Sequence, residues 1–309
     1  MINRILIRVK VLQNLYSFML TKPDRTIQQA VKELDTSFEK SHELYYYLLH
    51  LIVELTDMQD RRLDEAKHKF KPTEADLHPN TRFVDNRLVQ ALRENEEFNK
   101  FCRDHLVAWD DILFLNTMLN HVLQSEYYAD YMALEQVSMA DDCELWRQLL
   151  RQVIVNDELF EDMVEAMSVY WSCEDVEIMS DFAVKTIRRI EEGSNEPLIP
   201  MFRNEDDKEF GEKLFKRTIQ QMDENNILID SLLRTDRWER DRVALLDRLI
   251  MCAALSEMLC FDSIPTTVTL NEYIELAKIF STPNSGQFVN GVLNSALNTL
   301  RERGRITKP

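Results

Sequence analysis

The amino-acid sequence predicts an all-α protein, and three observations support this fold class. Apolar residues recur at helical spacing through most of the 309-residue chain. The chain has only five glycines and eight prolines, a composition typical of helices joined by short loops. Neither of the glycine-rich phosphate-binding patterns, G-x-G-x-x-G and G-x-x-x-x-G-K-[S/T], can be built from those five glycines.

The first expected helix covers residues 3–20 and ends before Pro23. Arg4 and Arg8 are four residues apart, so they share a face of this helix that differs from its apolar stripe. The stripe consists of Ile5, Val9, Leu12, Leu15, Tyr16 and Met19.

Helices are also expected through the middle of the chain. A helical pattern runs from Thr26 towards Phe70, as one helix or two, and two prolines mark a loop over residues 71–82. The stretch GSNEPLIP at residues 193–200 is the clearest break in the chain. Shorter helices are expected at about 85–94, 96–106, 109–123, 125–137, 142–155, 157–170 and 174–191.

Beyond that break, a long amphipathic helix is expected from about Asp207 to Leu233. Three apolar stripes within residues 246–300 then predict three helices packed on each other, the last two joined by the loop STPNSGQ at 281–287. A glycine inside a helix costs about 1 kcal/mol relative to alanine. Gly291 is therefore interpreted as a close approach between helices.

The five cysteines are odd in number and lack C-x-x-C spacing, which argues against zinc and disulfides and for a reducing, cytoplasmic setting. The N-terminal stretch is interrupted by Arg4, Arg8 and Lys10, so it reads as neither a signal peptide nor a membrane span. Two Glu-x-x-His pairs occur, but no matching inward glutamates accompany them, so no metal or cofactor is expected.

The net charge of −17 argues against nucleic acid as a partner until its distribution is considered. Residues 1–25 carry +4, residues 26–204 carry −18 and residues 205–309 carry −3. The acidity therefore belongs to the middle of the chain. A local basic surface, rather than the total charge, decides whether RNA can bind.

Two runs near the C-terminus resemble a known family. The first is Ile264-Pro265-x-x-Val268-x-Leu270-Asn271-Glu272-x-x-Glu275-Leu276-Ala277-Lys278-x-Phe280, and the second is FVNGVL at residues 288–293. Together with Asp247-Arg248, Ala254 and Glu257 upstream, and Leu12-Gln13-x-Leu15-Tyr16 in the first helix, they resemble the bacterial transcription antitermination factor NusB.

The resemblance implies a NusB-like helical bundle formed by the chain ends. Residues 1–25 would supply its first helix, residues 205–309 its core, and residues 26–204 an acidic helical insertion. It also places the first helix beside the last two, so that Arg4, Arg8 and Phe288 are expected on one continuous face.

The family's RNA-binding residues carry over to matching positions. Arg4, Arg8 and Lys10 are expected to contact phosphates, for which the planar fork of arginine is suited. Ile5 and Leu6 stand where the family is often basic. The alternative is that these cations only keep a surface helix soluble.

A second group of expected RNA contacts surrounds the loop at residues 281–287. Phe280 and Phe288 would stack on unpaired bases, and Asn284 and Ser285 would make polar contacts. The alternative for the two phenylalanines is packing in the core.

By resemblance, the function is antitermination of ribosomal RNA operons, without catalysis. The protein would bind single-stranded boxA-type RNA together with NusE, a small-subunit ribosomal protein, alongside other antitermination factors and RNA polymerase. Repulsion by the acidic segment predicts a monomer. A helical scaffold that has lost RNA binding stays open as an alternative. An RNA methyltransferase fusion would need a glycine-rich cofactor loop that this chain lacks.

Overall fold

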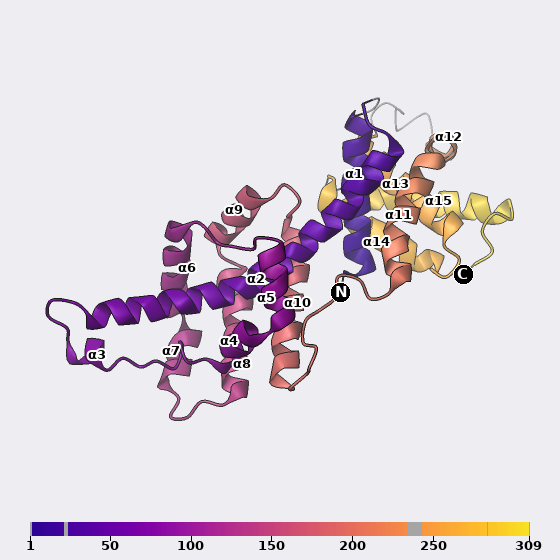
Figure 1. Cartoon of the computed structure of the whole chain (residues 1–309). Helices are drawn as coiled ribbons and strands as arrows, with labels where there is room; N and C mark the ends of the chain where they lie inside the picture. The colour runs from indigo at the N-terminus through magenta and orange to yellow at the C-terminus, as the bar shows by residue number, and fades with distance from the viewer. Residues whose placement is uncertain (1, 22–23, 234–242, 283, 309) are drawn as a thin grey trace. The chain divides into compact units, whose positions relative to one another are not determined.

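The computed structural model describes residues 2–21, 24–233, 243–282 and 284–308, and these residues form fifteen α-helices and one π-helix without a strand (Figure 1). The all-α prediction is confirmed. Packing divides the chain into a middle unit, Glu39–Met201, and a terminal unit made of Ile2–Phe38 and Phe202–Pro309. The functional boundaries expected at 25/26 and 204/205 stay a prediction.

The terminal unit is built around α13 (Leu245–Cys260), which packs against five other helices. Between Arg248 and Glu257 this helix has an unbroken run of uncharged, mostly apolar residues, so it can be buried on every side. The neighbours of α13 are α1 (Arg4–Thr21), α11 (Glu205–Gln220), α12 (Met222–Leu232), α14 (Thr266–Phe280) and α15 (Ser285–Glu302).

The position of α1 agrees with the expected 3–20, but its predicted apolar stripe is partly wrong. Ile5 and Tyr16 are 48% and 40% exposed, whereas every residue from Leu6 to Leu12 is buried. The cause is that α1 packs against both α11 and α13. Burial therefore extends around the helix and includes Arg8 and Lys10, which were expected at the surface.

The helix expected at 207–233 is two helices, α11 and α12, which meet at Gln221. Within α11, Gly211 lies so close to its neighbours that an added Cβ would be 2.9 Å from the Phe38 ring and 3.0 Å from Ile7. An added Cβ at Gly291 would have no heavy atom within 4 Å. The close approach expected at Gly291 is therefore wrong, and Gly211 is where one occurs.

The middle unit contains most of a single long helix, α2 (Ile27–Lys67), whose first residues up to Phe38 belong to the terminal unit. Its remaining helices are mostly short. They are α3 (Glu74–Leu77), α4 (Arg87–Glu94), α5 (Glu96–Asp104), α6 (Ile112–Gln124), α7 (Glu126–Ala133), α8 (Met139–Gln148), the π-helix η1 (Leu149–Ile154), α9 (Glu158–Met167) and α10 (Cys173–Glu191).

Side-chain caps explain why these short helices begin where they do. The side chain of Asn86 accepts from backbone N–H groups in the first turn of α4, and that of Asp111 does the same for α6. Ser138 and Ser172 form capping boxes with acidic residues in the first turns of α8 and α10. No helix in the described ranges is long and apolar enough to cross a membrane.

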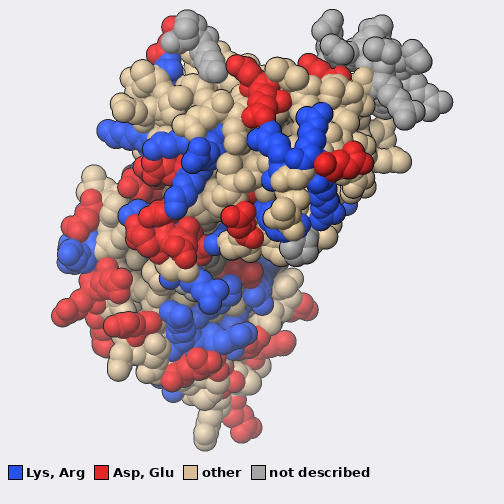
Figure 2. Space-filling view, turned by 90° about the vertical axis from the view of Figure 1, so that its right-hand side faces the viewer, with Lys and Arg blue, Asp and Glu red and all other residues tan. Residues whose placement is uncertain are grey.

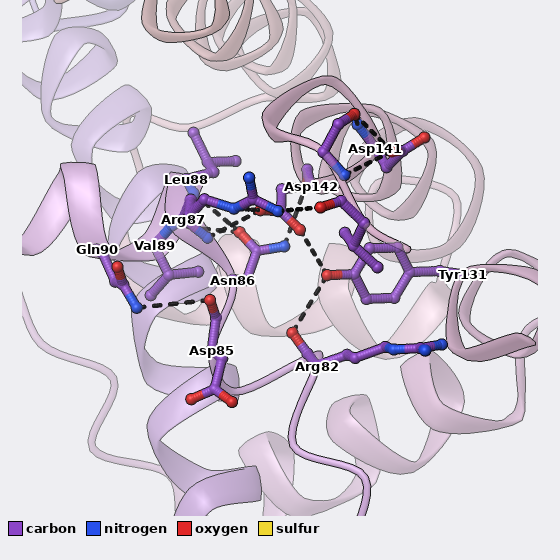
Figure 3. Close-up of polar contacts among 12 residues, drawn as sticks. Arg82, Asp85, Asn86, Arg87, Leu88, Val89, Gln90, Tyr131, Asp141 and Asp142 are labelled. Atoms are coloured by element: carbon purple, nitrogen blue, oxygen red, sulfur yellow. Dashed lines mark hydrogen bonds and ion pairs between the residues drawn. The ribbon is translucent and has the colours of Figure 1, made fainter. Parts of the chain in front are cut away.

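A buried polar network ties α4, α7 and α8 together (Figure 3). Asp142 is 1% exposed, and its carboxylate lies 2.6 Å from the Tyr131 hydroxyl and 2.9 Å from Arg87 Nε. Asn86 Nδ2 donates to the Asp142 carbonyl at 3.3 Å. Burial and the neighbouring carboxylate both raise the pKa of Tyr131. The buried carboxylate of Asp142 is therefore satisfied by Tyr131 and Arg87, and the network stabilises the packing of these helices.

Helix α2 meets the segment after α10 through His42, which is buried in the middle unit. His42 Nε2 lies 3.0 Å from the carbonyl oxygen of Ile199, and its ring stacks on Tyr45. Tyr45 in turn bonds Thr186 on α10 at 2.7 Å. Burial lowers the pKa of His42 to about 4, so this histidine is neutral in the folded protein at neutral pH.

Candidate nucleic-acid interface

Arg8 is held inside the terminal unit by Glu257. Its Nε and Nη2 each donate to one carboxylate oxygen of Glu257 at 2.8 Å, in the two-pronged geometry that arginine favours. Arg8 is 3% exposed and Glu257 is fully buried. The same carboxylate accepts from Thr269 at 2.9 Å and from Tyr273 at 3.1 Å, so one group joins α1, α13 and α14.

The electrostatics of this cluster keep Arg8 charged. Burial alone would lower the pKa of Arg8, but the hydrogen bonds and charge of Glu257 outweigh it and raise the pKa. Burial, reinforced by Glu257, raises the pKa of Tyr273 well above its ordinary value. The surface position expected for Arg8 is wrong, because this residue is buried against Glu257. A phosphate would have to displace Glu257 to reach the guanidinium of Arg8.

Lys10 is also inside, with 1% of its surface exposed. The expected surface position of Lys10 is therefore corrected in the same way, by the packing of α1 against two helices. Arg4 differs, because 38% of its side chain is exposed. Its Nε donates to Asp207 at 2.9 Å and its guanidinium lies over the Phe210 ring at 5.1 Å. Of the three expected cations, only Arg4 presents an accessible charge.

The second set of expected RNA contacts, which we call the loop group, lies where α14 ends and α15 begins. It consists of Phe280, Asn284, Ser285 and Phe288, and it is partly exposed. Phe280 and Phe288 are half-buried and Asn284 is exposed, so all three can be reached from solvent. Ser285 is 3% exposed, and its hydroxyl lies 2.8 Å from Thr282 Oγ1 and 3.1 Å from Asp247 Oδ2. The solvent-facing position expected for Ser285 is wrong, because its hydroxyl is used to fix the start of α15.

The two groups lie at different ends of α13. Arg8 meets Glu257, whereas Ser285 meets Asp247, ten residues earlier on the same helix. At 1.5 Å rise per residue these points are about 15 Å apart along the axis. Because Arg8 is buried, the single continuous face expected for Arg4, Arg8 and Phe288 is wrong for Arg8, whereas Arg4 and Phe288 both keep accessible surface.

Sequence reasoning missed two cations near Arg4. Lys213 and Arg217 are exposed on α11 and share the face of that helix that carries Phe210, the ring beneath Arg4. Their i, i+4 spacing after a buried aromatic residue was the available signal. It was hidden by the numerous acidic residues of the same helix.

Charge is divided unevenly between the two units. Residues 39–201 hold 16 basic and 34 acidic residues, a net −18, while the terminal unit holds 21 basic and 20 acidic, a net +1. On the face drawn in Figure 2, Lys and Arg side chains lie in groups separated by Asp and Glu. Any anion site in the terminal unit is therefore a local cluster of cations.

One group of side chains in the described residues could offer three metal ligands. Atoms of Glu161, Glu165 and Cys173 lie within 4.8 Å of one another, and all three residues are exposed. The Cys173 thiol already donates to Glu161 at 3.2 Å, and this bond, with burial and nearby carboxylates, raises the thiol pKa. Because a metal binds the thiolate, these contacts work against a metal here, and we assign none.

The sequence is similar to members of one known protein family. The NusB family model matches residues 174–298, which span α10 to most of α15. The transcription antitermination protein NusB of Salinibacter ruber is 38% identical over 110 residues, covering 36% of this chain and 68% of that protein. The NusB protein of Bacillus cereus is 34% identical over a stretch that covers 35% of this chain and 85% of that protein. The NusB protein of Chloroherpeton thalassium is 37% identical over a stretch that covers 33% of this chain and 47% of that protein. No solved structure matches.

The terminal unit is an all-helical structure organised around one buried helix, α13. It carries the NE-x-x-ELAK and FVNGVL runs on its last two helices. The chain belongs to the NusB family. Family membership indicates a role in transcription antitermination.

Proposed function

We propose that this chain is a transcription antitermination factor that binds boxA-type single-stranded RNA together with a NusE-type ribosomal protein. It would support transcription of ribosomal RNA operons by holding nascent RNA near the polymerase, without making or breaking a bond. The observation that carries this proposal is the family match over α14 and α15, which bear the partly exposed residues Phe280, Asn284 and Phe288. The near-neutral charge of the terminal unit supports it further.

The contacts proposed for RNA are revised by the geometry. Arg4 supplies a phosphate contact, and Phe280, Asn284 and Phe288 supply stacking and polar contacts at the loop. Arg8 and Lys10 support these groups from within the fold rather than touching RNA. The acidic middle unit should keep the protein monomeric through like-charge repulsion.

The decisive experiment measures binding of fluorescent boxA-type RNA by anisotropy, with and without the NusE-type partner, against a scrambled RNA. We expect binding to require the boxA order and to tighten when the partner is present. Phe288→Ala should weaken binding by about 1–3 kcal/mol and leave the salt dependence unchanged, because it removes stacking and no charge. Failure of the wild-type chain to bind RNA even with the partner would reject the proposal.

A scaffold that keeps its protein partners and has lost RNA is the second candidate. The burial of Arg8 and Lys10 favours it, since two of three expected phosphate contacts are used inside the fold. The same experiment separates the two functions. A scaffold would bind the NusE-type partner and retain no RNA in the presence or absence of that partner.

A further inference from the structure

A pocket of about 460 Å³ lies in the terminal unit along one face of α11, between the start of α1 and the end of α13. Three cations line it, Arg4 from α1 and Lys213 and Arg217 from α11. Its volume falls within the range of about 300–1,000 Å³ that is usual for small-ligand sites. None of the residues expected from the sequence to bind RNA, except Arg4, lies in this pocket.

The cations differ in how far they are already neutralised. Arg4 is paired with Asp207 at 2.9 Å, and Lys213 is paired with Glu209 at 2.5 Å. Arg217 has no carboxylate within ion-pair distance among the described residues, and its Nη1 is 3.5 Å from the side-chain oxygen of Gln220. Arg217 therefore offers the least compensated positive charge in the pocket and the planar donor fork that suits a phosphate.

An aromatic pair lies beside these cations. The rings of Phe210 and Phe261 meet edge to face, with centroids 5.0 Å apart, and both line the pocket. Phe210 is buried beneath Arg4, whereas Phe261 is half-buried and keeps part of its ring accessible. Lys308 donates to the Phe261 carbonyl at 2.6 Å, which fixes the backbone that carries this ring.

The pocket also has acceptors. Asp206 and Asp262 line it together with the Ser263 hydroxyl. A free inorganic anion would meet these two carboxylates as well as the cations. A ligand with an anionic end, a flat apolar face and N–H or O–H donors would satisfy all three kinds of lining group, and a nucleotide has these features.

We propose that this pocket seats one nucleotide of the bound single-stranded RNA. Its phosphate lies against Arg217, Lys213 and Arg4, and its base lies against the exposed part of the Phe261 ring. The inference rests on the RNA binding proposed above and adds a contact at the end of α13 away from the loop group. A strand that touches both this pocket and the loop group would cross the surface of the helices that cover α13, over about the length of that helix.

The test uses the full chain and fluorescent boxA-type RNA, with affinity measured at several salt concentrations. Arg217→Gln and Lys213→Gln should each weaken binding and lower the slope of log affinity against log salt by about 0.7, the value for one phosphate contact on a single strand. Phe261→Leu should weaken binding and leave that slope unchanged. Far-UV circular dichroism would verify that each variant is folded.

Lys208→Gln is the matched control. Lys208 lies on the same helix, is 61% exposed against 62% for Lys213, and is likewise paired with an acidic residue one turn away, but it does not line the pocket. It should bind RNA with the wild-type affinity and slope.

The outcomes separate this inference from the proposed function. If the wild-type chain binds RNA and the two pocket-cation variants behave like Lys208→Gln, the pocket does not hold RNA while the proposed function stands. If Lys208→Gln loses as much slope as the pocket variants, the effect is one of total charge and the pocket assignment is again overturned. If the wild-type chain does not bind RNA, the proposed function and this inference fall together.

Discussion

Arg8 and Glu257 form a buried ion pair. Removal of Arg8 would leave the buried Glu257 carboxylate without its cationic partner, whereas removal of Glu257 would still leave Arg8 with Glu272, 3.5 Å from its Nη1. Spacing in the sequence assigned Arg8 correctly to a face of α1 but could not reveal what that face meets. Its partner is 249 residues further along the chain. Arg4, one turn earlier, is partly exposed, so two arginines with the same local pattern have different roles.

This difference predicts different stabilities for the two alanine variants. Arg8→Ala should lower the free energy of unfolding by about 3–5 kcal/mol, because it leaves a buried carboxylate unpaired. Arg4→Ala should change it by no more than about 1 kcal/mol, as is usual for exposed pairs. Urea unfolding followed by circular dichroism measures both. Combining Arg8→Met with Glu257→Met should restore much of the loss, and equal stabilities of the two alanine variants would contradict the assignment.

His42 predicts how acid affects the middle unit. The pKa of His42 is about 4 in the folded chain, chiefly because of burial, against about 6.5 when unfolded. Between these values the unfolded chain binds a proton that the folded chain does not. Stability should therefore fall as pH drops from 6.5 towards 4, by up to about 3 kcal/mol from this residue, and should be unaffected by it above pH 7.

The control for this prediction is His42→Gln, which keeps an N–H donor near Ile199 and removes the titrating group. The midpoint of urea unfolding should fall less between pH 7 and pH 4.5 for this variant than for the wild type. Other groups that titrate in acid affect both proteins alike, so the difference between the two declines reports His42. Parallel declines would show that His42 is not the source.

At the scale of single elements, apolar periodicity predicted where most helices lie. The expected 3–20 and 174–191 became α1 and α10 with ends shifted by one residue at most. Periodicity could not find the break at Gln221, because the apolar residues of α11 and α12 continue across it. It also could not foresee that α1 is enclosed on two sides, which depends on helices formed by the other end of the chain.

The site was predicted less completely than the fold. The FVNGVL run located the half-buried Phe288 through resemblance, and Arg4 was located through the first helix. Lys213 and Arg217 were missed because their association with Arg4 exists only once α1 and α11 pack together.

Two glycines in helices give opposite predictions for the same substitution. Gly211→Ala would place a Cβ 2.9 Å from the Phe38 ring and should destabilise the protein by about 1–3 kcal/mol. Gly291→Ala meets open space on an exposed position, so the better helix propensity of alanine should stabilise by up to about 1 kcal/mol. Thermal unfolding distinguishes them. A gain at Gly211 would mean that α1, α2 and α11 separate easily to admit the extra methyl group.

At the scale of the whole molecule, the separation of charge predicts where RNA does not bind. Residues 39–201 carry a net −18, which repels phosphates within about 8 Å at physiological salt. Photocrosslinking of thiouridine-containing boxA-type RNA, followed by peptide mapping, should yield adducts in α1, α11 and α13–α15 and none in residues 39–201. Adducts concentrated in the middle unit would contradict both the charge argument and the assigned interface.

The Arg8–Glu257 pair also bears on the order of events during protein synthesis. At about 5–20 residues per second, roughly 10–50 seconds separate the addition of Arg8 from that of Glu257. All of residues 39–201, which form a compact unit of their own, are synthesised in that interval. During this time α13 has not yet been synthesised, so the apolar surface of α1 stays uncovered and Arg8 lacks its partner Glu257. The terminal unit therefore completes its fold only after Glu257 has been synthesised, and α1 is the segment that chaperones would have to shield until then.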